Sequence, residues 1–115
     1  MAGPFCCGPI VWAEIADANG IRKDRPAVIV TPDDEITATG LLKVVAVPST
    51  LQDPLPADHV LLPWHAQGHP RTGLNRKCAA VCSWLAEISA QDVQSISGRV
   101  PPPVFAQIAA KVAAP

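Results

Sequence analysis

One arginine and a nearby pair of hydroxyl residues have the types and spacing expected of a phosphate-binding site. Arg25 begins the apolar, β-branched run 25–31, and Ser49 and Thr50 follow a second such run at 41–47. In an antiparallel pair, the start of one strand lies beside the end of the other. A guanidinium binds phosphate through two parallel hydrogen bonds, and a hydroxyl adds a directional third. The arrangement predicts stabilisation of a phosphorane-like transition state, with an ordinary loop contact as the alternative.

Basic residues gather in two polar segments that we expect to be loops. One cluster ends the segment 16–24, the other lies within 64–77, and no acidic residue occurs between Asp58 and Glu87. The acidic residues 33–35 lie elsewhere in the chain. If the two loops meet, they form a groove that attracts phosphates; taken separately, each cluster is also typical of solvated loop charge. The candidate phosphate ligands are Arg22, Lys23, Arg25, Arg71, Arg76 and Lys77.

Three further residue types could contribute to a site. Trp64, in the second basic segment, is the aromatic residue best placed to stack on a base, whereas Trp12 and Trp84 are predicted to be core residues. Histidine suits acid–base catalysis near neutral pH, but polar surface is the alternative interpretation for His59, His65 and His69.

The four cysteines do not have the spacing of a zinc ribbon. They occur as Cys6-Cys7 and Cys78-x3-Cys82. On a strand, the second pair would point the same way but lie about 13 Å apart, too far to share one ion. On a helix the same two sulfurs would be neighbours. We predict buried or inert thiols and no metal site.

Composition narrows the class of protein. The chain has 115 residues, which predicts a single domain over 1–115 with a flexible N-terminus at 1–7. Nine basic against ten acidic residues give a net charge of −1, so any nucleic-acid surface must be a local patch. Tyrosine is absent, which excludes an aromatic base-stacking sheet.

No apolar stretch approaches the roughly 20 residues of a membrane-spanning helix, so we expect a cytoplasmic protein with reduced cysteines.

Thirteen prolines exclude long helices and end the expected strands. The run 78–88 fits either a helical stripe or a strand buried on both faces. Residues 89–92 resemble a helix start. Short strands with a terminal helix predict a mainly β fold, a small barrel. The expected strands are 10–15, 25–31, 41–47, 59–62 and 98–100, and the expected helix is 101–113.

Several motifs, in order and spacing, carry a resemblance to a known family over about residues 8–113. They are Gly8-x-Ile10-Val11-Trp12, Arg25-Pro26-Ala27-Val28-Ile29-Val30-Thr31-Pro32, Val45-Ala46-Val47-Pro48-Ser49-Thr50, Gly73-Leu74, Cys78-Ala79-Ala80-Val81-Cys82 and Gly98-Arg99-Val100. The chain resembles the MazF/PemK toxin–antitoxin ribonucleases, whose SH3-like barrel is shared with CcdB. Because that family has a strand in the corresponding place, the resemblance favours a strand at 78–88.

The resemblance implies a toxin that acts as an mRNA interferase without metal or cofactor. The 2′-hydroxyl of single-stranded RNA would attack the adjacent phosphate and leave a cyclic phosphate and a 5′-hydroxyl. The family's catalytic residues would fall on Arg25 and Thr50, with Ser49 as the substitute for Thr50. A homodimer with RNA in the dimer groove, a cognate antitoxin and a bacterial or archaeal cytoplasm are also implied.

An alternative function stays open at this point. The short first loop and Ser83-Trp84 depart from the family's pattern. A barrel with these changes could bind a protein partner without cleaving RNA, either as a CcdB-like poison of a topoisomerase or as a degenerate toxin. RNA cleavage by the purified protein distinguishes the two functions.

Overall fold

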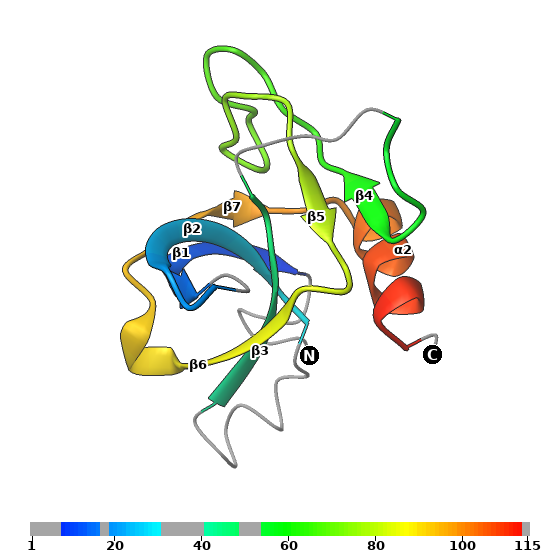
Figure 1. Ribbon diagram of the computed structural model, residues 1–115. Coiled ribbons are helices and arrows are strands. Elements are labelled where there is room, and N and C mark those ends of the chain that lie inside the picture. The colour runs from blue at the N-terminus through cyan, green and yellow to red at the C-terminus, as the bar shows by residue number, and fades with distance from the viewer. Residues whose placement is uncertain (1–7, 17–18, 31–40, 49–53, 114–115) are drawn as a thin grey trace, which may run out of the picture.

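The computed structural model describes residues 8–16, 19–30, 41–48 and 54–113. Five strands form one antiparallel sheet in the order β6-β3-β2-β1-β7, and β4 pairs with β5 in a second sheet (Figure 1). The strands are β1 (Pro9–Ala16), β2 (Arg22–Ile29), β3 (Leu41–Ala46), β4 (His59–Leu61), β5 (Ala79–Val81), β6 (Leu85–Ser89) and β7 (Ser95–Arg99). A 3-10 helix, η1 (Ala90–Asp92), precedes β7, and the α-helix α2 (Pro102–Ala113) ends the described chain.

The predicted mainly β fold with a C-terminal helix is confirmed, but the described strands do not form a closed barrel. The strands predicted at 10–15, 41–47 and 59–62 and the helix at 101–113 correspond to β1, β3, β4 and α2. The predicted final strand, 98–100, begins earlier, at Ser95. The helix start expected at 89–92 is a single 3-10 turn. Among the described helices, none is both long and apolar enough to cross a membrane.

The first loop is shorter than the sequence predicts. Residues 22–24 are predicted to be loop, but they belong to β2 and pair with the end of β1. Their side chains are charged and exposed, so the usual apolar signal of a strand is missing. Cross-strand pairing with β1 extends the hairpin instead, and an ion pair between Arg22 Nε and Glu14 Oε1 (2.7 Å) spans it.

The prediction of one strand over 78–88 is wrong. The chain turns after β5, where the N–H of Trp84 donates to the carbonyl oxygen of Val81 (2.9 Å), and then continues as β6. Strand β5 pairs with β4, whereas β6 pairs with β3 at the edge of the large sheet. Neither glycine nor proline marks this turn, so local sequence does not reveal it.

The large sheet has an apolar cluster on each of its faces. One cluster joins the sheet to β4, β5 and α2 and includes Ile10, Val28, Leu62 and Ile108. The expected apolar face of the helix is confirmed, because Ile108 is fully buried while Val104, Phe105 and Val112 pack against the same cluster. The other cluster contains buried residues of β1, β2, β3 and β6. Both clusters contain residues of β2 and β3, and the candidate site lies where these two strands meet the pocket.

Candidate functional site

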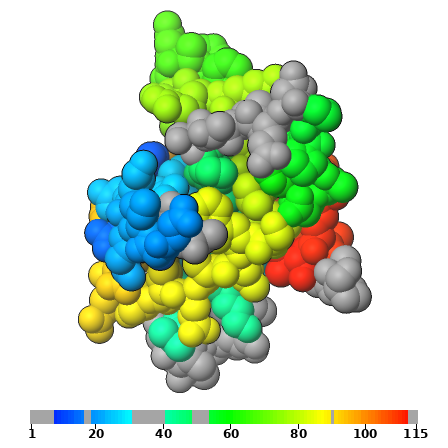
Figure 2. Space-filling model, in the orientation of Figure 1, coloured from blue at the N-terminus to red at the C-terminus, as the bar shows by residue number. Residues whose placement is uncertain are grey.

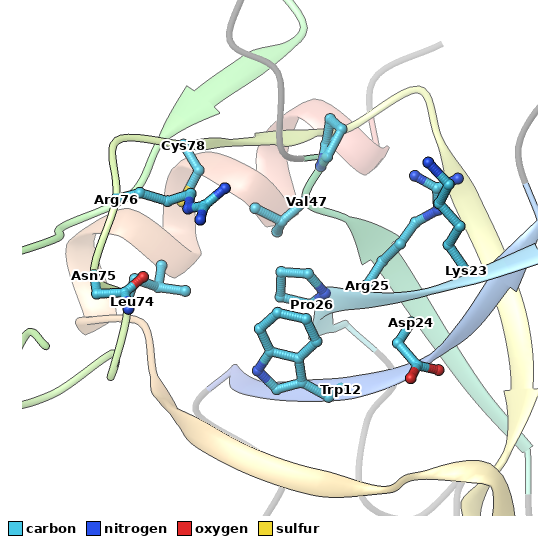
Figure 3. A pocket seen from close by; sticks show the side chains of 11 residues that line it. Trp12, Lys23, Asp24, Arg25, Pro26, Val47, Leu74, Asn75, Arg76 and Cys78 are labelled. Carbon is cyan, nitrogen blue, oxygen red and sulfur yellow. The ribbon is translucent and has the colours of Figure 1, made fainter.

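A pocket of about 360 Å³ lies between the β1–β2 hairpin, the end of β3 and the loop that leads into β5. Figure 2 shows this loop, in green, as a protrusion above the blue hairpin. In Figure 3, Arg76 lies on one side of the pocket and the side chains of Lys23 and Arg25 on the other. The lining residues are Trp12, Lys23, Asp24, Arg25, Pro26, Val47, Pro48, Leu74, Asn75, Arg76 and Cys78.

The pairing of β2 with β3 brings the end of β3 beside Arg25. Ala27 is opposite Ala46 in the antiparallel register, and the N–H of Val47 donates to the carbonyl oxygen of Pro26 (2.9 Å). Continuing this register by one residue places Pro48 beside Arg25, and both residues line the pocket. The predicted catalytic Thr50 and its substitute Ser49 come directly after Pro48 but lie outside the described residues.

Two contacts orient the guanidinium of Arg25. Its Nε–H donates to the carbonyl oxygen of Ile15 (3.1 Å), and its Cζ lies 4.9 Å from the ring centroid of Trp84. A cation over an indole face is attracted by the ring quadrupole. Trp84 is half-buried and packs against the second core cluster, so its predicted core position is confirmed only in part. The side chain of Arg25 is therefore held in place at the pocket before any ligand binds.

The segment 64–77 forms neither helix nor strand, and a buried threonine organises it. The Thr72 hydroxyl donates to the carbonyl oxygen of Pro63 (2.8 Å) and accepts the N–H of Leu74 (3.1 Å). The Ser97 hydroxyl donates to the carbonyl oxygen of Thr72 (2.7 Å) and thereby attaches the loop to β7. These bonds satisfy buried backbone groups and fix the part of the loop that carries Asn75 and Arg76 into the pocket.

Two of the three histidines also support this loop. Nδ1 of His65 accepts the N–H of Gln67 (3.1 Å), and Nδ1 of His69 accepts the N–H groups of Arg71 (3.1 Å) and Thr72 (3.3 Å). Both side chains therefore shape the loop backbone, and neither is among the residues that line the pocket.

The structure separates the six basic candidates. Lys23, Arg25 and Arg76, from both predicted clusters, line the same pocket. Arg22 is ion-paired with Glu14 across the hairpin, and Lys77 is exposed but not among the lining residues. Arg71 lines a different hollow, at the end of β7. RNA binding by any of these side chains stays a prediction.

Trp12 is the residue that sequence reasoning placed wrongly. The sequence predicts it in the core, yet it is 36% exposed and lines the pocket. The alternation along β1 contains the missed signal, because buried Val11 and Ala13 flank Trp12 and the next outward residue is charged Glu14. Trp64 is 41% exposed and is not among the lining residues.

Polar atoms beside Trp12 add hydrogen-bonding capacity to the pocket. The Asp24 carboxylate accepts a hydrogen bond from Nε2 of Gln94 (2.8 Å), which holds it in position. Asn75 offers both a donor and an acceptor from the opposite loop. An aromatic face with a carboxylate and an amide nearby suits a nucleobase, and the cations suit its phosphate.

The two cysteines in the described part of the chain are free and buried, as predicted. Burial raises the pKa of both the Cys78 and the Cys82 thiol, so both remain protonated and weakly nucleophilic near neutral pH. Within residues 8–16, 19–30, 41–48 and 54–113, no group of three or more His, Cys, Asp or Glu side chains could hold a metal ion. Cys6 and Cys7 lie outside the described residues.

The arrangement of strands and helix is similar to that of several solved structures. MazF from Deinococcus radiodurans superposes with a TM-score of 0.72 at 19% identity, covering 93% of this chain and 91% of that one. An endoribonuclease in complex with its cognate antitoxin, from a mycobacterial species, gives 0.71 at 14% identity and covers 96% and 92%. The Mycobacterium tuberculosis toxin MazF-mt6 gives 0.69 at 19% identity and covers 90% and 91%.

The family model described as "PemK-like, MazF-like toxin of type II toxin-antitoxin system" matches residues 7–114. The chain therefore belongs to the PemK/MazF toxin family. No curated protein matched the sequence.

Proposed function

We propose that this toxin is a metal-independent endoribonuclease that cuts single-stranded RNA. One observation carries the proposal: Lys23, Arg25 and Arg76 line one pocket at the point where β3 leads into Ser49 and Thr50. Three cations from two segments, β2 and the loop before β5, attract a phosphodiester, and the fixed guanidinium of Arg25 can bind it through two hydrogen bonds. The family membership supports the same assignment.

The reaction is an intramolecular transfer at phosphorus. The 2′-oxygen forms a bond to the adjacent phosphorus while the bond from phosphorus to the 5′-oxygen breaks. The 2′-hydroxyl loses a proton, and the leaving 5′-oxygen gains one. Arg25 stabilises the charge that develops on the non-bridging oxygens, and Thr50, with Ser49 as its substitute, donates a hydrogen bond to one of them. The products are a 2′,3′-cyclic phosphate and a 5′-hydroxyl.

The remaining partners follow from the same proposal. The toxin acts in the cytoplasm on mRNA, forms a homodimer and is inhibited by a cognate antitoxin. The Deinococcus radiodurans MazE-MazF structures and the mycobacterial toxin–antitoxin complex have the same fold as this chain, which supports an antitoxin partner here. We propose no cofactor.

Cleavage in the presence of EDTA tests the function directly. We expect the purified protein to cut single-stranded RNA with EDTA present. The downstream fragment should carry a 5′-hydroxyl, so polynucleotide kinase should phosphorylate it without prior dephosphorylation. Products with 5′-phosphate ends, or cleavage that needs an added divalent ion, would contradict the mechanism. Failure to cut any of a set of RNAs that together contain every short sequence would contradict the proposed activity.

Replacing Trp12 by alanine is expected to weaken RNA binding about tenfold, because stacking of one base on an aromatic ring contributes about 1–3 kcal/mol. The measurement is fluorescence anisotropy with 2′-O-methyl RNA, which lacks the attacking hydroxyl. Trp64→Ala is the matched control, since Trp64 is similarly exposed but is not among the residues that line the pocket. We expect little change for it. The sequence-based prediction for Trp64 gives the opposite order, so the comparison decides between the two tryptophans.

A further inference from the structure

A second hollow, of about 480 Å³, lies at the end of β7 beside the start of α2. Its lining residues are Arg71, Gly98, Arg99, Val100, Pro101 and Pro102. It contains two arginines and no acidic residue, and it shares no residue with the pocket that contains Arg25. The proposed cleavage mechanism assigns no role to it.

The backbone places the two arginines side by side. The N–H of Arg99 donates to the carbonyl oxygen of Arg71 (2.8 Å). A Cβ atom at Gly98 would overlap that same oxygen and the backbone of Thr72, so only glycine allows this approach of loop and strand. The Ser97 hydroxyl bonds the Thr72 carbonyl one residue further on. The positions of both guanidinium-bearing residues are therefore fixed by rigid backbone contacts.

Among the described residues, no acidic side chain neutralises the charge of this pair. In the part of the chain that the structure describes, neither Arg71 nor Arg99 forms an ion pair, and both are exposed. The adjacent helix end supplies no competing anion ligand. Pro102 and Pro103 have no N–H group, and the N–H groups of Val104 and Phe105 both bond to the Pro101 carbonyl oxygen. An anion in this hollow would therefore be bound by the two guanidinium groups.

We propose that Arg71 and Arg99 form a second phosphate-binding site for the RNA backbone, separate from the cleavage pocket. This inference rests on the proposed ribonuclease function. One loop connects the two sites, because Arg71 lines the hollow and Arg76 lines the cleavage pocket. The five peptide units between them span at most about 18 Å. A single strand cut at Arg25 can therefore reach the second site within a few nucleotides. Two guanidinium forks match the geometry of a phosphodiester.

The test compares RNA of two lengths on the double variant Arg71→Ala/Arg99→Ala. The control is Lys43→Ala/Lys111→Ala, which removes the same charge from residues that line neither pocket. Binding is measured with 2′-O-methyl RNA of mixed sequence, one about 4 and one about 16 nucleotides long. We expect about tenfold weaker binding of the long RNA, unchanged binding of the short one, and little effect of the control on either. The slope of log K against log salt for the long RNA should become shallower by about 0.7 for each phosphate that the double variant no longer binds.

Several outcomes overturn the proposal. The proposal fails if the double variant loses affinity equally for both RNA lengths, or if it keeps its affinity for the long RNA. It also fails if the control variant loses the same affinity for the long RNA. The hollow would belong to a protein partner instead if the double variant lost binding of an oligoglutamate peptide but kept its RNA affinity. If the wild type cleaves RNA while the double variant binds the long RNA normally, only this inference fails. If the wild type neither binds nor cuts RNA, the proposed function fails with it. Thermal melting of both variants shows whether they are folded.

Discussion

Replacing Arg25 by alanine is expected to slow RNA cleavage by about 10³-fold, the usual effect of removing a group that stabilises transition-state charge. The guanidinium is fixed beside the end of β3 by the Ile15 carbonyl oxygen and by the ring of Trp84. Because it is already oriented, its charge acts on the phosphorane without a reorganisation step. Removal of the hydrogen bond and of the cation–π interaction should lower stability by only about 1 kcal/mol, so the variant should remain folded.

Single-turnover cleavage at saturating RNA measures this effect, with thermal melting as the check on folding. Arg25→Lys keeps the charge but loses the two-pronged geometry, and we expect it to recover only a small part of the rate. Lys43→Ala removes a charge outside both pockets and should cleave normally. A folded Arg25→Ala variant that cuts RNA at the wild-type rate would show that another group carries the reaction.

Replacing Gly73 by alanine is expected to destabilise the fold by about 3 kcal/mol and to impair both pockets. Gly73 has φ of 72°, in the left-handed region that costs other residues about 1–2 kcal/mol. A Cβ there would also overlap the carbonyl oxygen of Ser97 on β7. Since that atom belongs to the backbone, the loop must move away from the strand. Arg71 and Arg76, on either side of Gly73, would move with it.

Gly20→Ala separates the two contributions. Gly20 has φ of 80°, but a Cβ at that position meets no atom within 4 Å. Its replacement should therefore lower the free energy of unfolding only by the strain of the left-handed conformation, about 1–2 kcal/mol. Urea unfolding of both variants gives the difference, which we expect to be at least about 1 kcal/mol. Equal destabilisation would mean that the loop can leave β7 without cost, and RNA cleavage would then be unaffected by Gly73→Ala.

Much of the fold could be predicted because each strand carries its own signal. β-branched residues marked β1 and β3, and Pro101 to Pro103 marked the start of α2. The errors occur where local signals are absent. Residues 22–24 are charged, and they join β2 because β1 offers a long pairing partner. The turn within 78–88 has no glycine or proline, and it exists because β5 and β6 pair with strands of different sheets.

The candidate site, like the fold, could be predicted from the sequence only in part. Arg25 and its nearness to the end of β3 followed from two strand motifs and antiparallel pairing alone. The sequence did not show that Arg76 would reach this pocket while Arg71 reaches another. That separation depends on the buried Thr72 and on two hydrogen bonds from β7 to the loop, one from Ser97 to Thr72 and one from Arg99 to Arg71. Contacts between distant residues leave no local pattern, so only the tertiary structure reveals them.

By itself, then, the sequence determined the mainly β fold, the C-terminal helix, the family and the arginine proposed for catalysis. The type of an element depends largely on the spacing of apolar residues within it, and that spacing is visible in the sequence. The tertiary structure alone decided which cations share a pocket, that Trp12 faces the pocket, and that Arg71 and Arg99 lie side by side. These features depend on how a loop of 64–77 packs on β7, where one buried hydroxyl and two glycines without side chains allow backbones to meet.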